Sequence, residues 1–422
     1  MVFTGIIVSF YYFPFEFSFL PGLNTKMGLA VYGIITSLIS LMSIREIRFP
    51  YNLVRIEISA VIVSLVGLVA VVINNTPDLA YATYVVSMTV WLSGAYSVCY
   101  LIKTIHGKIS VELLTVYLVS VCVAQCIIAL IIDSNIVIKN IVDAYVMQDQ
   151  LFLTDVERLY GIGASLDTAG VRFSICLLML TFTIDKNKNS MSLGLLIVSV
   201  LAFLVIAIVG NMVARTTIVG VGLSLIYAIM TFKPIRVSMG FFRLLKVSLI
   251  ALIIIIPICV YLYDNSPQFY RLSRFAFEGF FNLIETGEWE IDSNEKLKSM
   301  MVFPDNFKTW IIGDGYFSNP FNTDPTYVGP YIGGYYMGTD IGFLRFIFYF
   351  GFVGLLAFSA FLVSVSKECI NMLPDYKVLI FLILLLGFVV WLKVATDVFL
   401  VFALLICIGN MQDAPQQFET ES

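Results

Sequence analysis

The sequence predicts an all-α polytopic membrane protein with about twelve transmembrane helices, and three observations support this. The 422-residue chain is 59% hydrophobic and only 13% charged, whereas soluble domains are about 45–50% apolar and about 25% charged. The apolar residues form long runs, and the mean hydropathy is +0.93. Lysines and arginines gather in short segments between those runs. We therefore expect a single transmembrane domain over residues 1–422.

The length of each apolar run predicts the spans, because a bilayer core needs about 20 apolar residues per helix. The run at residues 2–13 counts as a short first span, since the bulky residues after it argue against a cleavable signal peptide. The further spans are expected at residues 27–43, 54–74, 80–102, 111–132, 170–185, 193–210, 216–232, 247–264, 341–364, 378–394 and 396–410.

Cationic segments predict the orientation of the spans. Five such segments fall on one face, and their lysines and arginines are Arg45, Arg48, Arg55, Lys103, Lys108, Lys186, Lys188, Lys233, Arg236, Arg243, Lys246, Lys367 and Lys377. The positive-inside rule makes that face, with both termini, cytoplasmic. The opposite face then carries two segments, residues 133–169 and 265–340. Both are much longer than the usual helix connections of about 2–8 residues, which is typical of functional loops.

The larger outer segment, residues 265–340, contains seventeen aromatic residues and has two parts. Its first part, "QFYRLSRFAFEGFFNLIE", alternates apolar and polar residues at helical spacing and predicts an amphipathic helix in the membrane interface. Its last part is rich in Gly, Tyr, Asn and Asp and includes Asp314, Tyr335 and Tyr336. Tyrosine rings beside such polar groups suit a sugar. The ordinary alternative is an aromatic interfacial belt.

Four arginines stand at helix entrances on the predicted outer face, where the positive-inside rule disfavours cations: Arg158, Arg172, Arg215 and Arg345. A guanidinium presents a planar fork that pairs with two phosphate oxygens at once. Arginines at headgroup depth therefore predict a site for a phosphate or diphosphate. The hydroxyl of Thr216 is a candidate donor for this site, and ordinary turn chemistry is the alternative for it. The alternative is a helix-end anchor whose side chain reaches the headgroups.

Aspartates on the same face supply candidates for proton transfer, since a carboxylate can act as a general base toward a sugar hydroxyl. Asp340 is favoured because it lies five residues before Arg345, although an Asp there would also suit a helix N-cap. Asp167 is expected to contact the substrate. The only histidine, His106, falls in a predicted cytoplasmic loop. Histidine-based metal sites and Ser–His–Asp triads therefore have little material here.

Three segments of the chain resemble the O-antigen and capsule repeat-unit polymerases of the Wzy type, which belong to the same broad group as the O-antigen ligases. These segments are "RLYGIGASLDTAGVRFS", "GNMVARTTIVGVG", and "WIIGDGYF" leading to "TDIGFLRFIFYFGFVGLL". Together with the many spans and one large late outer loop, the likeness covers most of the chain. The last segment is the most specific of the three.

The resemblance implies a GT-C-like helical bundle in the bacterial inner membrane, with its active site facing the periplasm. Such enzymes join oligosaccharide units carried on undecaprenyl diphosphate, by glycan transfer from the lipid diphosphate to a sugar hydroxyl of the next unit. They use no metal and no cofactor. By this resemblance, Arg158, Arg172, Arg215 and Arg345 would hold the diphosphates. Taken with the position of Asp340, we predict Arg215, Arg345 and Asp340 as the catalytic residues. The substrate-binding residues would be Arg158, Arg172, Thr216, Asp167, Asp314, Tyr335 and Tyr336.

The expected partners are lipid-linked oligosaccharides and membrane lipids, and the resemblance leaves room for a chain-length regulator. No basic run is long enough to follow a nucleic acid. One alternative is an O-antigen ligase that transfers the glycan to a lipid or protein acceptor. Ligases usually rely on a histidine in the large loop, and residues 265–340 contain none. Another is a lipid-linked oligosaccharide flippase, which would need cations at mid-membrane rather than at helix ends.

Overall fold

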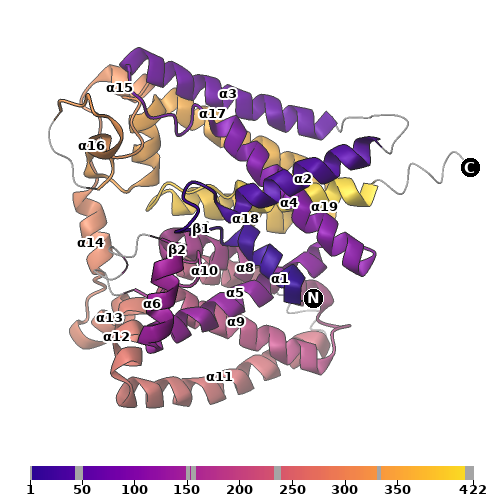
Figure 1. The fold of residues 1–422 in the computed structure, drawn as a ribbon. Helices are drawn as coiled ribbons and strands as arrows, with labels where there is room; N and C mark the ends of the chain where they lie inside the picture. The colour runs from indigo at the N-terminus through magenta and orange to yellow at the C-terminus, as the bar shows by residue number, and fades with distance from the viewer. Residues whose placement is uncertain are drawn as a thin grey trace, which may run out of the picture. The chain divides into compact units, whose positions relative to one another are not determined.

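The computed structural model describes residues 2–42, 51–148, 153, 158–231, 239–329 and 334–413. Each predicted apolar run forms a helix (Figure 1). These helices are α1 (Val2–Tyr12), α2 (Thr25–Met42), α3 (Tyr51–Asn74), α4 (Tyr84–His106), α5 (Val111–Ser134), α8 (Leu166–Asn187), α9 (Leu193–Val213), α10 (Thr217–Thr231), α11 (Met239–Asn265), α17 (Gly342–Met372), α18 (Lys377–Val390) and α19 (Phe399–Asp413). Arg45, Arg48, Lys233 and Arg236 of the predicted cytoplasmic segments lie outside the described residues.

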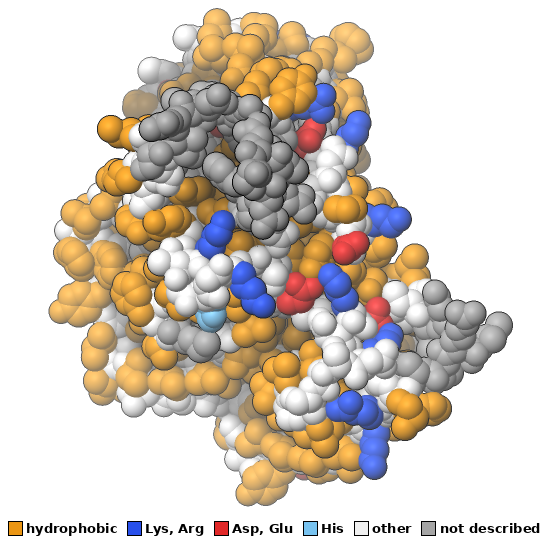
Figure 2. Space-filling view, turned by 90° about the vertical axis from the view of Figure 1, so that its right-hand side faces the viewer, with side chains coloured by type: hydrophobic (Ala, Val, Ile, Leu, Met, Phe, Trp, Pro, Cys, Tyr) orange, Lys and Arg blue, Asp and Glu red, His pale blue; other side chains and the backbone are white. Residues whose placement is uncertain are grey.

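Among the described residues, seven helices are long and apolar enough to cross a membrane: α3, α4, α5, α8, α9, α11 and α17. Helices α1, α2, α10 and α19 are apolar but shorter, and α18 has 14 residues. Hydrophobic side chains also cover much of the face drawn in Figure 2. A multi-pass, predominantly α-helical membrane protein is thus confirmed, whereas the number of twelve spans and the orientation stay predictions.

The two long predicted outer segments contain shorter elements. The first holds α6 (Ile136–Tyr145) and strand β2 (Val146–Met147), which pairs antiparallel with β1 (Glu16–Phe17). This small sheet departs from the all-α prediction, because two-residue strands leave no periodicity in the sequence. The second segment holds α12 (Pro267–Ala276), α13 (Glu278–Thr286), α14 (Asp292–Ser299), α15 (Phe307–Ile311), α16 (Pro320–Thr323) and the 3-10 turn η1 (Tyr336–Gly338). Another 3-10 turn, η2 (Pro374–Tyr376), joins α17 to α18.

The chain forms two compact units, each built from two stretches of sequence. Unit 1 comprises Met1–Gly28 and Lys108–Glu290, and unit 2 comprises Leu29–Gly107 and Ile291–Ser422. The larger outer segment is therefore divided: α12 and α13 belong to unit 1, and α14 to η1 belong to unit 2. The prediction of one transmembrane domain with outer loops at residues 133–169 and 265–340 stays a prediction.

In unit 1, α8 is the central helix and packs against α5, α9 and α10 (Figure 1). Its residues are buried almost without interruption from Ala169 to Ile184, as expected for a helix surrounded by others. Helix α11 is the opposite case, since Gly240 and Ala251 are its buried residues. An apolar helix exposed in this way suits contact with lipid.

In unit 2, α17 packs against α3, α18 and α19, and α4 packs against α19. Helix α17 is kinked, because Phe350 and Gly351 have non-helical backbone angles and Gly351 has φ +67°. A Cβ on Gly351 would lie 2.1 Å from the carbonyl oxygen of Ile311. A glycine is therefore required where the turn after α15 meets the kink.

Candidate functional site

Three separate segments of unit 1 meet at the ring of Phe275 on α12. The guanidinium carbon of Arg215 lies 4.2 Å from the ring centroid, and that of Arg158 lies 5.0 Å from it. Arg215 lies in the turn between α9 and α10, while Arg158 precedes α8. A cation near an aromatic face is attracted by the ring quadrupole. Two predicted arginines are thus brought together by a phenylalanine that the sequence analysis did not single out.

Arg215 also holds the junction between α12 and α13. Its Nε donates a hydrogen bond to the carbonyl oxygen of Phe275 at 2.9 Å, and its Nη2 lies 2.6 Å from Oε2 of Glu278. Both charged side chains are largely buried, with 17% and 15% exposed. The helix predicted over "QFYRLSRFAFEGFFNLIE" is therefore two helices that break at Phe277, and Arg215 contacts the residues on both sides of that break.

Close packing between α8 and α10 fixes the backbone beside Arg215. A Cβ on Gly170 would lie 2.9 Å from the Cβ atoms of Ala214 and Thr216, so only glycine allows this approach. The buried hydroxyl of Ser174 donates to the carbonyl oxygen of Thr216 at 3.0 Å. On the side-chain side, the Thr216 hydroxyl donates to the carboxylate of Asp167. Thr216 and Asp167 therefore contact each other directly.

The "YGIG" segment, between Arg158 and α8, is held by Gln125 of α5. The Gln125 amide accepts from the backbone N–H of Ile162 at 3.0 Å and donates to the carbonyl oxygen of Ile162 at 3.0 Å. A Cβ on Gly161 would lie 2.3 Å from the Gln125 side-chain oxygen, and Gly163 has φ +69°. The glycines of this motif thus serve a tight turn against α5.

Arg172 lies inside α8 rather than at its entrance, because the helix begins at Leu166 and not near residue 170. Its guanidinium carbon is 5.7 Å from the ring centroid of Phe13, and its carbonyl oxygen accepts from the hydroxyl of Tyr12 at 2.8 Å. Arg172 therefore contacts the end of α1 and the residue after it, whereas Arg158 and Arg215 contact Phe275.

Arg345, at the start of α17 in unit 2, lies between two aromatic rings. Its guanidinium carbon is 3.9 Å from the ring centroid of Phe317 and 3.5 Å from that of Tyr335, and the residue is 5% exposed. Its Nη2 donates to the carbonyl oxygen of Phe317 at 3.1 Å. The buried carboxylate of Asp78 accepts from the backbone N–H groups of Phe317 and Ser318, each at 2.8 Å. Asp78 thereby fixes one wall of this aromatic cage.

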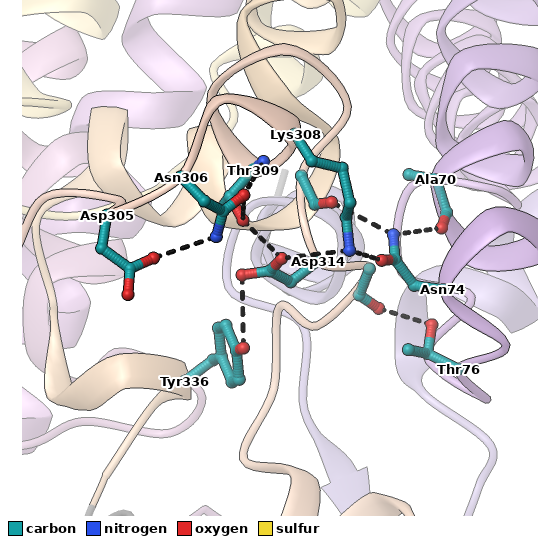
Figure 3. Close-up of polar contacts among 11 residues, drawn as sticks. Ala70, Asn74, Thr76, Asp305, Asn306, Lys308, Thr309, Asp314 and Tyr336 are labelled. Atoms are coloured by element: carbon teal, nitrogen blue, oxygen red, sulfur yellow. Dashed lines mark hydrogen bonds and ion pairs between the residues drawn. The ribbon is translucent and has the colours of Figure 1, made fainter. Parts of the chain in front are cut away.

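The Asp314 carboxylate lies among polar side chains of unit 2, as Figure 3 shows. It accepts hydrogen bonds from Thr309 at 2.7 Å and from the Tyr336 hydroxyl at 3.3 Å, and Lys308 Nζ lies 3.7 Å away. Lys308 in turn reaches the Asn74 side chain at 2.5 Å. Burial, and then the charge of Asp314, raise the pKa of Tyr336. Tyr336 is therefore protonated and serves as a donor.

The backbone of the "IGDG" segment docks on the kink of α17. The N–H of Asp314 donates to the carbonyl oxygen of Phe348 at 2.6 Å, and the N–H of Gly315 donates to that of Tyr349 at 3.0 Å. These carbonyl groups lack their usual helical partners because the kink interrupts the helix. The most specific motif of the resemblance thus has a structural role in this chain.

A second carboxylate network lies nearby in the same unit. Asp324 is buried and accepts hydrogen bonds from the hydroxyls of Thr326 and Tyr316, both at 2.6 Å. The bonds from Thr326, followed by that from Tyr316, lower the pKa of Asp324. At neutral pH Asp324 is therefore an ionised anchor for the loop.

The predicted site residues divide evenly between the two units. Unit 1 contains Asp167, Arg158, Arg172, Arg215 and Thr216, and unit 2 contains Asp314, Tyr335, Tyr336, Asp340 and Arg345. The N-cap alternative for Asp340 is wrong by one residue, because Ile341 occupies the N-cap position of α17. In the described part of the chain, no group of three His, Cys, Asp or Glu side chains could hold a metal ion.

The site in unit 1 includes two residues that the sequence analysis missed, Phe275 and Glu278. They lie on either side of the break at Phe277, Phe275 near the end of α12 and Glu278 at the start of α13. Glu278 is also a single acid within the apolar run "FAFEGFF". That isolated charge is the sequence feature that could have indicated a role for Glu278.

No family model matches the chain, nor does any curated protein or any solved structure. The function proposed below therefore rests on the residues and contacts described above.

Proposed function

We propose that this protein polymerises oligosaccharide repeat units carried on undecaprenyl diphosphate, at the outer face of the bacterial inner membrane. The observation that supports the proposal is the convergence of Arg158 and Arg215 on Phe275. These arginines come from two helix entrances on the predicted outer face, and Phe275 comes from the amphipathic part of the long outer segment. Cations gathered at predicted headgroup depth suit the diphosphate of a lipid carrier.

The proposed reaction is a glycan transfer. The bond between the anomeric carbon and the phosphate oxygen breaks, and its electron pair stays with the lipid diphosphate. A hydroxyl oxygen of the next unit forms the new glycosidic bond and loses its proton to a base. Arg215 and Arg158 stabilise the charge that grows on the diphosphate. Asp340 of unit 2 stays the base predicted from the sequence, and Asp314, Tyr335 and Tyr336 of that unit stay predicted contacts for sugar rings.

The Arg215–Glu278 pair adds a condition to this proposal. An incoming diphosphate competes with the Glu278 carboxylate, which lies 2.6 Å from Arg215. Because both partners are mostly buried, water screens the pair weakly, and the ligand must offer more charge than the single carboxylate it displaces. A diphosphate meets this requirement, whereas a neutral sugar does not.

The test is complementation of a host whose own polymerase has been deleted and which makes the cognate repeat unit. Surface glycan from the native chain, Arg215→Ala, Arg158→Ala and Arg345→Ala would be resolved on gels at matched membrane levels. Arg274→Ala is the matched control, since Arg274 lies on the same helix as Phe275 but pairs with Glu285. We expect a ladder from the native chain and the control, and a single capped repeat from the three variants.

Other outcomes separate the competing functions. A ladder that survives all three substitutions would overturn the diphosphate site. A native chain that gives no ladder, although the repeat unit is made, would overturn the polymerase. Repeat units that stay on the inner leaflet without the protein would instead favour a flippase, and transfer of a glycan made by another polymerase would favour a ligase.

A further inference from the structure

A small polar cavity of about 160 Å³ lies in unit 1, beside Arg158. It is formed by the end of α5, by α6, by the segment before α8, and by α12. Its lining residues are Ala129, Ile132, Asp133, Lys139, Leu153, Arg158, Leu159, Tyr160 and Arg271. We call it the Lys139 pocket. Lys139 and Arg271 were not among the predicted site residues.

The described lining of the Lys139 pocket has an excess of positive charge. Lys139, Arg158 and Arg271 contribute three cations, and Asp133 contributes one carboxylate. Asp133 is engaged already, because it accepts a hydrogen bond from Gln268 and lies 3.7 Å from Arg271. The formal charge of the described lining is therefore +2.

Two of the three cations have unused donors. The Nε of Arg158 is buried and has no hydrogen-bond partner among the described residues. The Lys139 ammonium makes no hydrogen bond or ion pair to a described residue, although it lines the pocket. A buried donor without a partner destabilises the protein. A ligand that accepts from the Nε of Arg158 would remove that cost, and the half-buried Lys139 ammonium could bind the same ligand.

We propose that the Lys139 pocket binds one phosphate group as a dianion. A charge of −2 matches the excess of two positive charges, whereas a sugar carboxylate would neutralise only one of them. The cavity volume of about 160 Å³ is enough for a tetrahedral oxyanion. Lysine and arginine are the side chains that hold phosphate in proteins.

The phosphate is carried by the released lipid, an assignment that rests on the proposed polymerase function. Glycan departure turns the outer phosphate of the lipid diphosphate from a diester-like group into a terminal group with one additional negative charge. Arg158 contacts both the Lys139 pocket and the Phe275 ring, on which Arg215 also packs. The pocket thus holds the terminal phosphate more tightly after transfer than before it.

The test measures binding to the purified full-length protein in detergent at pH 8, where phosphate is a dianion. The probes are inorganic phosphate, farnesyl monophosphate and farnesyl diphosphate, each titrated calorimetrically. We expect Lys139→Gln and Arg271→Gln each to weaken binding at least tenfold. Arg274→Gln is the control, because it removes an arginine of α12 that does not line the pocket, and it should change the affinity by less than twofold.

A second variant strengthens the test, since loss of folding cannot imitate its effect. Asp133→Asn removes the only described carboxylate of the pocket lining and should tighten phosphate binding severalfold. An unchanged or weakened affinity in Asp133→Asn would overturn the charge excess.

Four further results test the source of the phosphate, the pocket and the polymerase. Farnesyl diphosphate binding at least tenfold more tightly than inorganic phosphate, with the same dependence on Lys139, supports a lipid-borne group. Equal affinities would overturn the lipid assignment and leave a site for free phosphate. No binding of any probe, or binding indifferent to Lys139 and Arg271, would overturn the pocket. Phosphate binding that depends on Lys139, in a protein that yields no glycan ladder, would refute the polymerase and keep the pocket.

Discussion

Replacing Gly313 by alanine tests whether the "IGDG" segment locks the kink of α17. Gly313 has φ +84°, and a Cβ there would lie 2.4 Å from the carbonyl oxygen of Tyr349. The left-handed backbone costs about 1–2 kcal/mol for a residue with a Cβ. Relief of the clash would stretch the hydrogen bonds from Asp314 to Phe348 and from Gly315 to Tyr349, each contributing about 0.5–1.5 kcal/mol. We expect a total loss of about 2–5 kcal/mol in the free energy of unfolding.

Gly338→Ala supplies the matched control in the same unit. Gly338 has φ +66° with no atom within 4 Å of its added Cβ, so it carries the backbone cost alone, about 1–2 kcal/mol. The free energy of unfolding would be measured by denaturant titration in mixed micelles, followed by tryptophan fluorescence. Equal losses in the two variants would show that the contact between the segment and the kink contributes nothing, and would refute the reasoning.

Three further changes probe other contacts. Gly170→Ala crowds the α9–α10 turn and should lower both Tm and glycan polymerisation, whereas Gly194→Ala, which meets no atom within 4 Å, should leave both unchanged. The pKa of Asp324 is lowered below its ordinary value of 3.8, so its stabilisation is present above that value and is lost as pH falls through the folded-state pKa. Asp324→Asn should therefore lower Tm at pH 7. A difference in Tm between the native protein and this variant that stays undiminished below pH 3.8 would contradict this. Glu278→Gln weakens the contact with Arg215 and should speed amide hydrogen exchange in α12 and α13 about 5–30-fold, which corresponds to about 1–2 kcal/mol. Unchanged exchange would show that this contact does not stabilise the two helices.

The helices of this protein follow closely from the sequence, because hydrophobic run length is a local property that the bilayer requires. The helix boundaries are less well predicted. Helix α8 begins at Leu166, four residues before the predicted start, which moves Arg172 from the helix entrance into its second turn. The prediction used hydropathy, and the polar first turn with Asp167 carries no apolar signal.

The site depends on contacts between distant segments, and run length contains no information on these. Arg158 and Arg215 lie near each other because α12 places Phe275 beside both of them. The amphipathic pattern predicted α12 as a helix, but neither its break at Phe277 nor its contact with Arg215. Arg345 shows the same limit, since the cage around it depends on the fold of the loop that carries Phe317.

The division of each unit into two stretches of sequence has a consequence for synthesis of the chain. Helices α3 and α4 of unit 2 leave the ribosome early, but their partners α17 and α19 follow residue 290. Residues 108–290 are made in between, which takes about 10–40 s at about 5–20 residues per second. During that interval the first half of unit 2 waits in the membrane with its packing faces uncovered, while unit 1 becomes complete. Unit 2 is therefore the part of the protein most dependent on an insertase or chaperone that shields unpaired helices.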